Sequence, residues 1–217
     1  MNVDVIRDPV YILRINKPFD QETHDHIFQE MVANEERFED ATIDSGNDQR
    51  VNKDIRNNTV LYLDHVYKGQ RGNSILLSSL DSIFQTAQFK SLLTSSPYPL
   101  SSFNKTNYHE TQVSRYGNSG QSYTWHVDAL SNPDERMITV VYYAGLKKYE
   151  GGELLFSNSP IIDGKLVEKK PEILAINPEP NTMYVFASDT THAVAQTQSL
   201  EEFKLGRFSV NCWVGIK

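Results

Sequence analysis

The sequence predicts a mainly β protein of the α+β class, with a double-stranded β-helix (jelly-roll) core and N-terminal helices packed on the outside of one sheet. Eight short β-rich runs follow one another in the second half of the chain, and two helical patterns occupy the first half. The 217 residues can bury a core of their own, and all-β barrels of this length are commonly single domains. We therefore expect one domain over residues 1–217, in which residues 1–100 support a jelly-roll core over residues 101–217.

The first half begins with a predicted strand and a predicted helix. Strands are expected over residues 10–15 and 58–64. The helix is expected over residues 20–36, because Asp20 can cap its first turn. Ile27 and Met31, four positions apart, would lie on its buried face.

A longer helix is predicted over residues 73–93. Its apolar residues recur every three or four positions and would form one stripe: Ile75, Leu76, Leu80, Ile83 and Phe84. Two prolines within residues 95–99 would end this helix. Since an apolar stripe needs a surface to cover, we place both helices against the outside of the β structure.

The second half is predicted to consist of eight short strands. They cover residues 107–116, 122–128, 136–144, 153–157, 172–177, 182–187, 190–197 and 206–216. Turn residues separate them, including the pair Gly151-Gly152, which is typical of backbone with a positive φ. Short strands at this spacing are typical of a sandwich or a jelly roll.

Composition and charge exclude several classes of protein. No apolar run approaches the roughly 18 residues of a membrane span, and the first residues lack the pattern of a secretory signal. Cys212 is the only cysteine, which excludes an intramolecular disulfide and a cysteine-based metal cluster and favours a reducing cytoplasm. The net charge of −7 argues against general nucleic-acid binding. We therefore expect neither a membrane nor a nucleic acid as a partner.

Three residues of the second half form a candidate metal site. His126 and Asp128 are two positions apart in a predicted strand, so their side chains share a face and can converge on one ion. Alone, this pair is weak evidence, because a histidine beside a surface aspartate is common. His192, near the start of a later strand, supplies a second imidazole. Two histidines and one carboxylate are the facial triad of non-haem Fe(II) oxygenases, which leaves three coordination positions open.

The last predicted strand alternates between two kinds of side chain. One face is apolar and holds Phe208, Val210, Cys212 and Val214, and the other holds Arg207, Ser209, Asn211 and Trp213. If the apolar face packs under the helices, Arg207 points into the barrel, where an unpaired charge is very costly. We therefore expect a carboxylate, from the protein or from a ligand such as 2-oxoglutarate, to meet the Arg207 guanidinium.

Further motifs stand in order around these residues. They are Tyr116-Gly117-Asn118, a strand from Arg136 that ends in Tyr142-Tyr143, Gly151-Gly152-Glu153-Leu154, and the closing strand from Arg207 to Trp213. With them, residues 108–215 resemble the catalytic jelly roll of the prolyl 4-hydroxylase-like Fe(II)/2-oxoglutarate dioxygenases. The arginine-bearing branch, which includes the hypoxia-sensing prolyl hydroxylases, is the most similar.

The resemblance implies a role for each candidate residue. His126, Asp128 and His192 would bind Fe(II), Arg207 and Tyr143 would bind the C5 carboxylate of 2-oxoglutarate, and Tyr116 would line the cosubstrate pocket. The implied cofactor and cosubstrates are Fe(II), 2-oxoglutarate and O2, with ascorbate as an additional candidate. One departure is that Arg207 follows His192 by 15 residues, which is longer than usual in the family. The extra residues, 198–205, are expected to form an exposed loop.

The resemblance also implies a peptide or protein substrate with a hydroxylated side chain, proline first, while 2-oxoglutarate is converted to succinate and CO2. Arg136, Trp213 and Arg56 are the candidate substrate-binding residues. Arg56 belongs to the polar segment 50–58, which we expect either to cover the active site or to be an ordinary surface loop.

Other functions remain open at this point. A hydroxylase of a small molecule or free amino acid is the alternative within the superfamily. Nucleic-acid demethylases usually carry a second arginine six residues after the first, where this chain has Trp213. A non-catalytic jelly-roll module that kept a metal is the alternative of another class. Tyr142, Tyr143 and Trp213 would also fit as plain strand or core aromatics.

The remaining histidines are expected to lie outside the site. His24 and His26 are two positions apart on a predicted helix and do not share a face, so we expect them on a solvated surface. His65 and His109 have no partner pattern and are expected to be structural.

Overall fold

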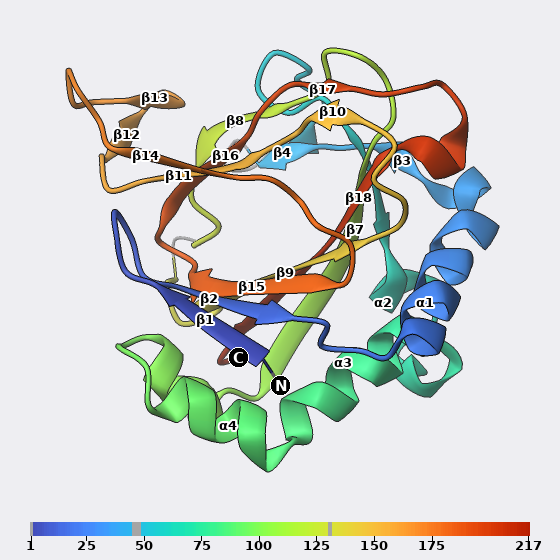
Figure 1. Ribbon diagram of the computed structural model, residues 1–217, viewed down its shortest axis with the longest axis horizontal. Coiled ribbons are helices and arrows are strands. Elements are labelled where there is room, and N and C mark those ends of the chain that lie inside the picture. Colours follow the sequence, from blue (N-terminus) through green and yellow to red (C-terminus); the bar gives the residue numbers. More distant parts are fainter. Residues whose placement is uncertain (1, 45–48, 130–131) are drawn as a thin grey trace.

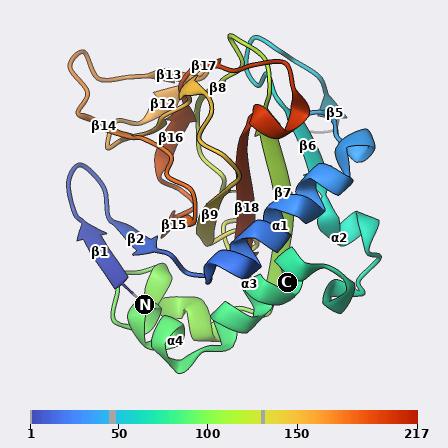
Figure 2. The ribbon, with the colours of Figure 1, turned by 45° about the vertical axis from the view of Figure 1, so that its right-hand side comes forward.

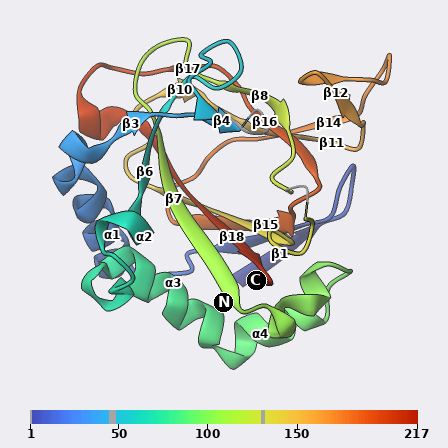
Figure 3. The same cartoon turned by 180° about the vertical axis from the view of Figure 1, so that it is seen from behind.

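The computed structural model describes residues 2–44, 49–129 and 132–217. In these residues an eight-stranded sheet, in the order β1-β2-β15-β9-β18-β7-β6-β3, faces a four-stranded sheet, in the order β14-β11-β16-β8. The helices lie along the outer side of the large sheet (Figure 1, Figure 2 and Figure 3). The predicted mainly β jelly roll, with N-terminal helices outside one sheet, is therefore confirmed.

The large sheet contains β1 (Asn2–Ile6), β2 (Ile12–Asn16), β3 (Glu39–Asp40), β6 (Thr59–Tyr62), β7 (Tyr108–Tyr116), β9 (Ile138–Ala144), β15 (Thr182–Ala187) and β18 (Arg207–Gly215). The small sheet contains β8 (Tyr123–His126), β11 (Leu154–Ser157), β14 (Ile173–Ile176) and β16 (Thr191–Val194). Three two-stranded pairs are β4 (Ile43–Asp44) with β5 (Gln49–Arg50), β10 (Glu150–Gly151) with β17 (Thr197–Gln198), and β12 (Ile161–Ile162) with β13 (Lys165–Leu166). The α-helices are α1 (Gln21–Ala33), α2 (Leu63–Val66), α3 (Ile75–Gln85) and α4 (Ala87–Thr94).

Strand β18 runs through the large sheet between β7 and β9 and pairs with both in antiparallel register. Its apolar face joins the main hydrophobic core through Phe208, Val210, Cys212 and Val214. Its other face turns Arg207, Ser209, Asn211 and Trp213 toward the cavity between the two sheets. The alternation in the sequence therefore gives the correct orientation of both faces.

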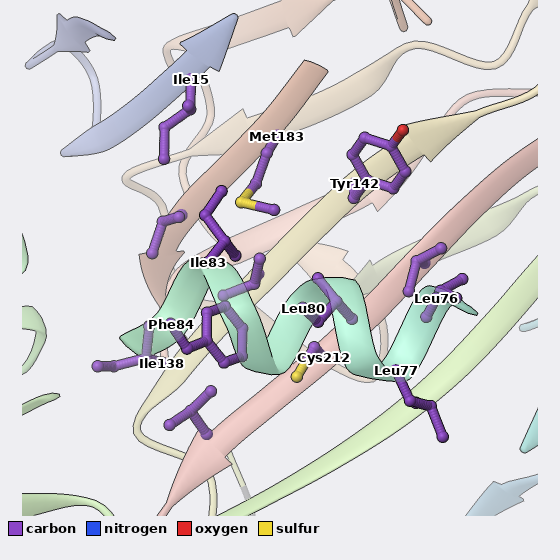
Figure 4. Packing of buried hydrophobic residues seen from close by; sticks show 14 of the residues in the cluster. Ile15, Leu76, Leu77, Leu80, Ile83, Phe84, Ile138, Tyr142, Met183 and Cys212 are labelled. Carbon is purple, nitrogen blue, oxygen red and sulfur yellow. The ribbon is translucent and has the colours of Figure 1, made fainter. Parts of the chain in front are cut away.

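The main core lies between α3 and the outer face of the large sheet (Figure 4). Leu80 and Ile83 of α3 are buried in this core together with Met183 and Cys212. The same cluster includes residues of α1, α4, β7 and β9. Burial raises the pKa of the Cys212 thiol to about 12, so this cysteine is a packing group without thiolate character.

The helix predicted over residues 73–93 is in fact two helices. Thr86 has extended backbone at the end of α3, and its side-chain oxygen accepts a hydrogen bond from the Phe89 amide in the first turn of α4. A capping threonine inside an apolar pattern thus breaks the helix, although the stripe continues across it. Ile75, predicted in that stripe, is 40% exposed because it lies in the first turn of α3.

The other predicted elements are present, most of them with shorter bounds; the strand over residues 182–187 has the predicted bounds, and the strand predicted over residues 10–15 is found at Ile12–Asn16. Asp20 caps α1 by accepting a hydrogen bond from the Thr23 amide at 2.7 Å, and Ile27 and Met31 are buried, as expected. The strand predicted over residues 58–64 ends at Tyr62, where α2 begins. All eight strands predicted in the second half are found. The two-residue strands were not predicted, because so few residues show no period in the sequence. Strand β1 was also missed, although Val3 and Val5 alternate with polar residues in it.

The expectation of a solvated surface is wrong for His24. Its side chain is buried between α1 and the sheet, where its Nδ1 lies 2.5 Å from the Tyr142 hydroxyl. Burial lowers the pKa of His24, so the neutral imidazole is the form that pairs with this hydroxyl. His26 is exposed, as expected. His109 lies outside the cavity between the two sheets, and its Nε2 is 3.1 Å from Oδ1 of Asp81.

We expect Leu80→Ala to lower the free energy of unfolding by about 2–5 kcal/mol, because it leaves a cavity under α3. Ile75→Ala, on the exposed side of the same helix, should change the free energy of unfolding by no more than about 0.5 kcal/mol. Urea denaturation followed by circular dichroism measures both values. Equal losses in the two variants would contradict the packing described here.

Candidate active site

A cavity of about 440 Å³ lies between the two sheets. It is walled by the inner face of β7, β9 and β18 on one side and by β8 and β16 on the other. All nine side chains that the sequence predicts for the site line this one cavity: Arg56, Tyr116, His126, Asp128, Arg136, Tyr143, His192, Arg207 and Trp213. Residues separated by up to 157 positions are therefore brought together.

His126, Asp128 and His192 each offer a ligand atom, and these atoms lie within 4.8 Å of one another. His126 on β8 is the direct cross-strand partner of His192 on β16, and Asp128 follows β8. The Asp128 carboxylate oxygens lie 3.9 Å from Nε2 of His126 and 3.5 Å from Nε2 of His192. The strand pairing thus brings the two imidazoles together. The strand predicted over residues 122–128 already ends at His126, and Asp128 just beyond it completes the cluster.

The backbone fixes which nitrogen of each imidazole is free. Nδ1 of His126 lies 2.8 Å from the Thr124 carbonyl, and Nδ1 of His192 lies 2.9 Å from the Thr190 carbonyl. A carbonyl only accepts, so both Nδ1 atoms carry the proton and both Nε2 atoms present a lone pair toward Asp128. Hydrogen bonds of this kind orient metal-binding histidines in general.

The surroundings of the site shift the pKa values of His126 and Asp128. Burial, reinforced by the neighbouring His192, lowers the pKa of His126 to about 3, so its imidazole is neutral. Burial alone would raise the pKa of Asp128, but His192, His126 and a 2.9 Å hydrogen bond from the Thr139 hydroxyl hold that pKa below its usual range. Two imidazoles and one carboxylate are the donor set that suits a divalent iron ion, so these residues could hold it.

Arg207 is buried at the other end of the cavity, with 1% of its surface exposed. Its Nε donates to the Gly152 carbonyl at 2.8 Å, and its Nη2 donates to the Tyr143 hydroxyl at 3.0 Å. The ring of Tyr116 lies 4.9 Å from the guanidinium carbon. No carboxylate pairs with Arg207 among the described residues. A buried guanidinium with only neutral partners is a site for an anionic ligand.

The two glycines of the Gly-Gly motif make room for this arginine. Gly151 and Gly152 have φ values of +69° and +68°. A Cβ on Gly152 would lie 2.7 Å from Cδ of Arg207, and a Cβ on Gly151 would lie 2.2 Å from the Gln196 carbonyl oxygen. Both the backbone conformation and the close approach therefore require glycine.

The candidate substrate residues surround the remaining part of the cavity. The Arg136 guanidinium lies 4.0 Å from the ring centre of Trp213 and donates to Glu110 at 3.0 Å. Residues 55–57 pair with the edge of β8, since the Thr124 amide donates to the Ile55 carbonyl at 2.9 Å. Arg56 is thus part of a wall that is hydrogen-bonded to β8.

Several residues of the site were not predicted from the sequence. The Tyr123 ring stacks on the His126 ring with centres 3.6 Å apart, and the guanidinium carbon of Arg56 lies 4.8 Å from the centre of the Tyr123 ring. Gln112 and Asn211 occupy facing positions on β7 and β18. The alternation that revealed Arg207 also places Asn211 inside, but no signal in the sequence marked Tyr123 or Gln112.

Comparisons with known proteins agree with this geometry. Residues 111–215 match the family model described as the 2OG-Fe(II) oxygenase superfamily. The resemblance inferred from the motifs is therefore confirmed. Among curated proteins, no sequence matches this chain.

Solved structures with a similar fold include two prolyl hydroxylases. One is a prolyl hydroxylase from Trichoplax adhaerens in complex with a hypoxia inducible factor oxygen degradation domain peptide fragment, with a TM-score of 0.65 and 19% identity over 94% of this chain and 83% of that chain. Another is a Pseudomonas putida prolyl-4-hydroxylase, with a TM-score of 0.60 and 18% identity over 95% and 92%. The epimerase SnoN, in complex with Fe3+, alpha ketoglutarate and nogalamycin RO, has a TM-score of 0.60 and 10% identity over 94% and 78%. At these identities the likeness shows the fold.

Within the described residues, no helix combines the length and the apolar character that crossing a membrane requires.

We expect Asp128→Ala to weaken Mn(II) binding by more than roughly 100-fold, because it removes the only carboxylate of the triad. Loss of a residue that only hydrogen-bonds to a metal ligand typically weakens metal binding by roughly 10–100-fold. Asp189→Ala removes an exposed aspartate near His192 and is the matched control. Isothermal titration calorimetry with Mn(II) measures both variants. Similar affinity in the two would show that the metal binds elsewhere.

Proposed function

We propose that this chain is a dioxygenase of the 2OG-Fe(II) oxygenase type that hydroxylates a side chain of a peptide or protein, with proline as the first candidate. The single observation that carries the proposal is the arrangement of one cavity. It combines a triad suited to a divalent metal with a buried arginine that has no anionic partner among the described residues.

His126, Asp128 and His192 are the proposed Fe(II) ligands. Iron bound there, together with 2-oxoglutarate and O2, would supply the oxidising chemistry, with release of succinate and CO2. The chain itself holds the three donor atoms in place through the Thr124 and Thr190 carbonyls. The Thr139 hydroxyl fixes Asp128 and is held in turn by Ser188 at 2.9 Å.

Arg207 and Tyr143 are the proposed partners of the distal carboxylate of 2-oxoglutarate. The Tyr143 hydroxyl already lies 3.0 Å from Nη2 of Arg207, so both groups can donate to one carboxylate. Burial raises the pKa of Tyr143, which keeps its hydroxyl protonated as a donor. Tyr116 covers the guanidinium and lines the same end of the cavity.

The substrate would bind between Trp213, Arg136 and Arg56. The ring of Trp213 offers an apolar wall that suits a pyrrolidine ring, and Arg136 is fixed over it by Glu110. The neighbouring prolyl hydroxylase structure that contains a peptide fragment supports a peptide substrate. The preference for proline rests on this likeness and on the family motifs. A cytoplasmic location is proposed with it, because the lone cysteine is a buried thiol.

A small-molecule hydroxylase is the second candidate function. SnoN, with the same fold, is described in complex with nogalamycin RO, so this architecture also accommodates a small molecule. The polar wall around Arg56 and Asn211 favours a substrate with polar groups in this part of the cavity.

Turnover assays separate the two candidates. The protein is incubated with Fe(II), 2-oxoglutarate, ascorbate and either proline-containing peptides or free amino acids, and products are analysed by mass spectrometry. The proposal expects a +16 Da peptide product that is lost in Asp128→Ala. A +16 Da product with free amino acids alone would reject the peptide claim and establish the second candidate.

We expect Arg207→Lys to raise the KM for 2-oxoglutarate by about 10-fold or more, because lysine cannot present two parallel donors to a carboxylate. Arg50→Lys, at an exposed position, is the control and should leave this KM unchanged. Initial rates of succinate formation at varied 2-oxoglutarate give the values. An unchanged KM in Arg207→Lys would mean that another cation binds the cosubstrate.

A further inference from the structure

Arg56 is a half-buried cation in the cavity wall whose partners are all neutral. Its Nε donates to Oδ1 of the buried Asn58 at 3.1 Å, and its Nη2 donates to Oε1 of Gln112 at 2.5 Å. Its guanidinium carbon lies 4.8 Å from the ring centre of Tyr123. Among the described residues no carboxylate forms an ion pair with it. The side chain is therefore held in one place, and no residue of the described part of the chain neutralises its charge.

The other charges of the cavity have partners or proposed partners. Arg136 is paired with Glu110 at 3.0 Å. In the proposed function Arg207 pairs with the distal carboxylate of the cosubstrate, and Asp128 with the metal. The charge of Arg56 alone is left over when the site is filled. Since a charge in a partly dry cavity is costly without an opposite charge, a further anion is expected beside it.

The surroundings of Arg56 supply further hydrogen-bond donors. Gln112 is fully buried, and its Nε2 has no hydrogen-bond partner among the described residues. Asn211, opposite Gln112 on β18, lines the cavity and donates to Ser114 at 3.0 Å. Four residues along β18 separate Asn211 from Arg207, which is about 13 Å at strand spacing. Arg56 and Arg207 therefore stand at different positions along the cavity.

We propose that Arg56 binds a carboxylate of the substrate, so that the substrate class is a carboxylate-bearing compound. The carboxylate comes either from a free amino acid or from an acidic residue beside the hydroxylated one in a peptide. Because Asn58, Gln112 and Tyr123 already hold the guanidinium, little conformational entropy is lost when the carboxylate binds. The inference rests on the proposed function, since it concerns the substrate of the same cavity.

The test compares matched pairs of compounds that differ only in the carboxylate. Protein loaded with Mn(II) and 2-oxoglutarate without O2 is titrated by calorimetry with free L-amino acids and their amides. The same protein is titrated with proline peptides that carry Asp or Asn beside the proline. The variants are Arg56→Gln, Arg56→Lys and, as the matched control at an exposed position of the adjacent strand β5, Arg50→Gln.

We expect at least one pair in which the carboxylate-bearing member binds the wild-type protein about 10-fold or more tightly than its neutral analogue. The preferred pair tells which source supplies the carboxylate. Arg56→Gln should abolish the preference, Arg56→Lys should keep part of it, and Arg50→Gln should keep all of it. These arms distinguish recognition of charge from a structural role of Arg56, which would weaken both members of a pair equally.

The inference is overturned if no carboxylate-bearing compound binds the wild-type protein better than its analogue, or if the preference survives in Arg56→Gln. The wild-type comparison decides the matter even if Arg56→Gln does not fold. Failure of the proposed function looks different, because Mn(II) and 2-oxoglutarate would then not bind in the first step.

Discussion

A strand inside an antiparallel sheet presents successive side chains to opposite faces. Strand β18, paired with β7 on one side and with β9 on the other, alternates in this way. On one side Phe208, Val210 and Cys212 are buried in the core under the helices. On the other side Arg207 and Trp213 line the cavity. A shift of one residue in the pairing register of β18 would turn the apolar side chains toward the cavity and bury Arg207 in the core. The register that forms the core is therefore also the one that forms the site.

Burial of the Arg207 guanidinium is the most demanding consequence of this arrangement. Desolvation of a charge is costly, and the protein offsets it with neutral acceptors, chiefly the Gly152 carbonyl and the Tyr143 hydroxyl. Gly152 can approach so closely only because it lacks a Cβ. The same environment leaves the guanidinium ready for an incoming carboxylate. The positive charge that is costly to bury is thus the feature that the proposed function assigns to the distal carboxylate of 2-oxoglutarate.

Much of this could be predicted from the sequence, because local rules decide it. Strand alternation turned Arg207 inward, and the cap at Asp20 marked the start of α1. The His-x-Asp spacing brought His126 and Asp128 together, although Asp128 lies just past the end of β8. What could not be predicted depends on tertiary contacts. His24 is buried because Tyr142 offers its hydroxyl from a strand 118 positions away. Arg56 and Gln112, which meet in the cavity wall, are likewise far apart in the chain. Short edge strands have too few residues to show a period.

In the proposed function, Arg207 and the triad bind one 2-oxoglutarate and one metal ion in the same cavity. A crystal structure of the protein with Mn(II) and 2-oxoglutarate, without O2, tests it most directly, because the anomalous signal locates the metal and the electron density locates the carboxylates. We expect the metal between His126, Asp128 and His192, with the distal carboxylate of 2-oxoglutarate on Arg207. A distal carboxylate bound to Arg56 instead, or a metal outside the triad, would contradict it.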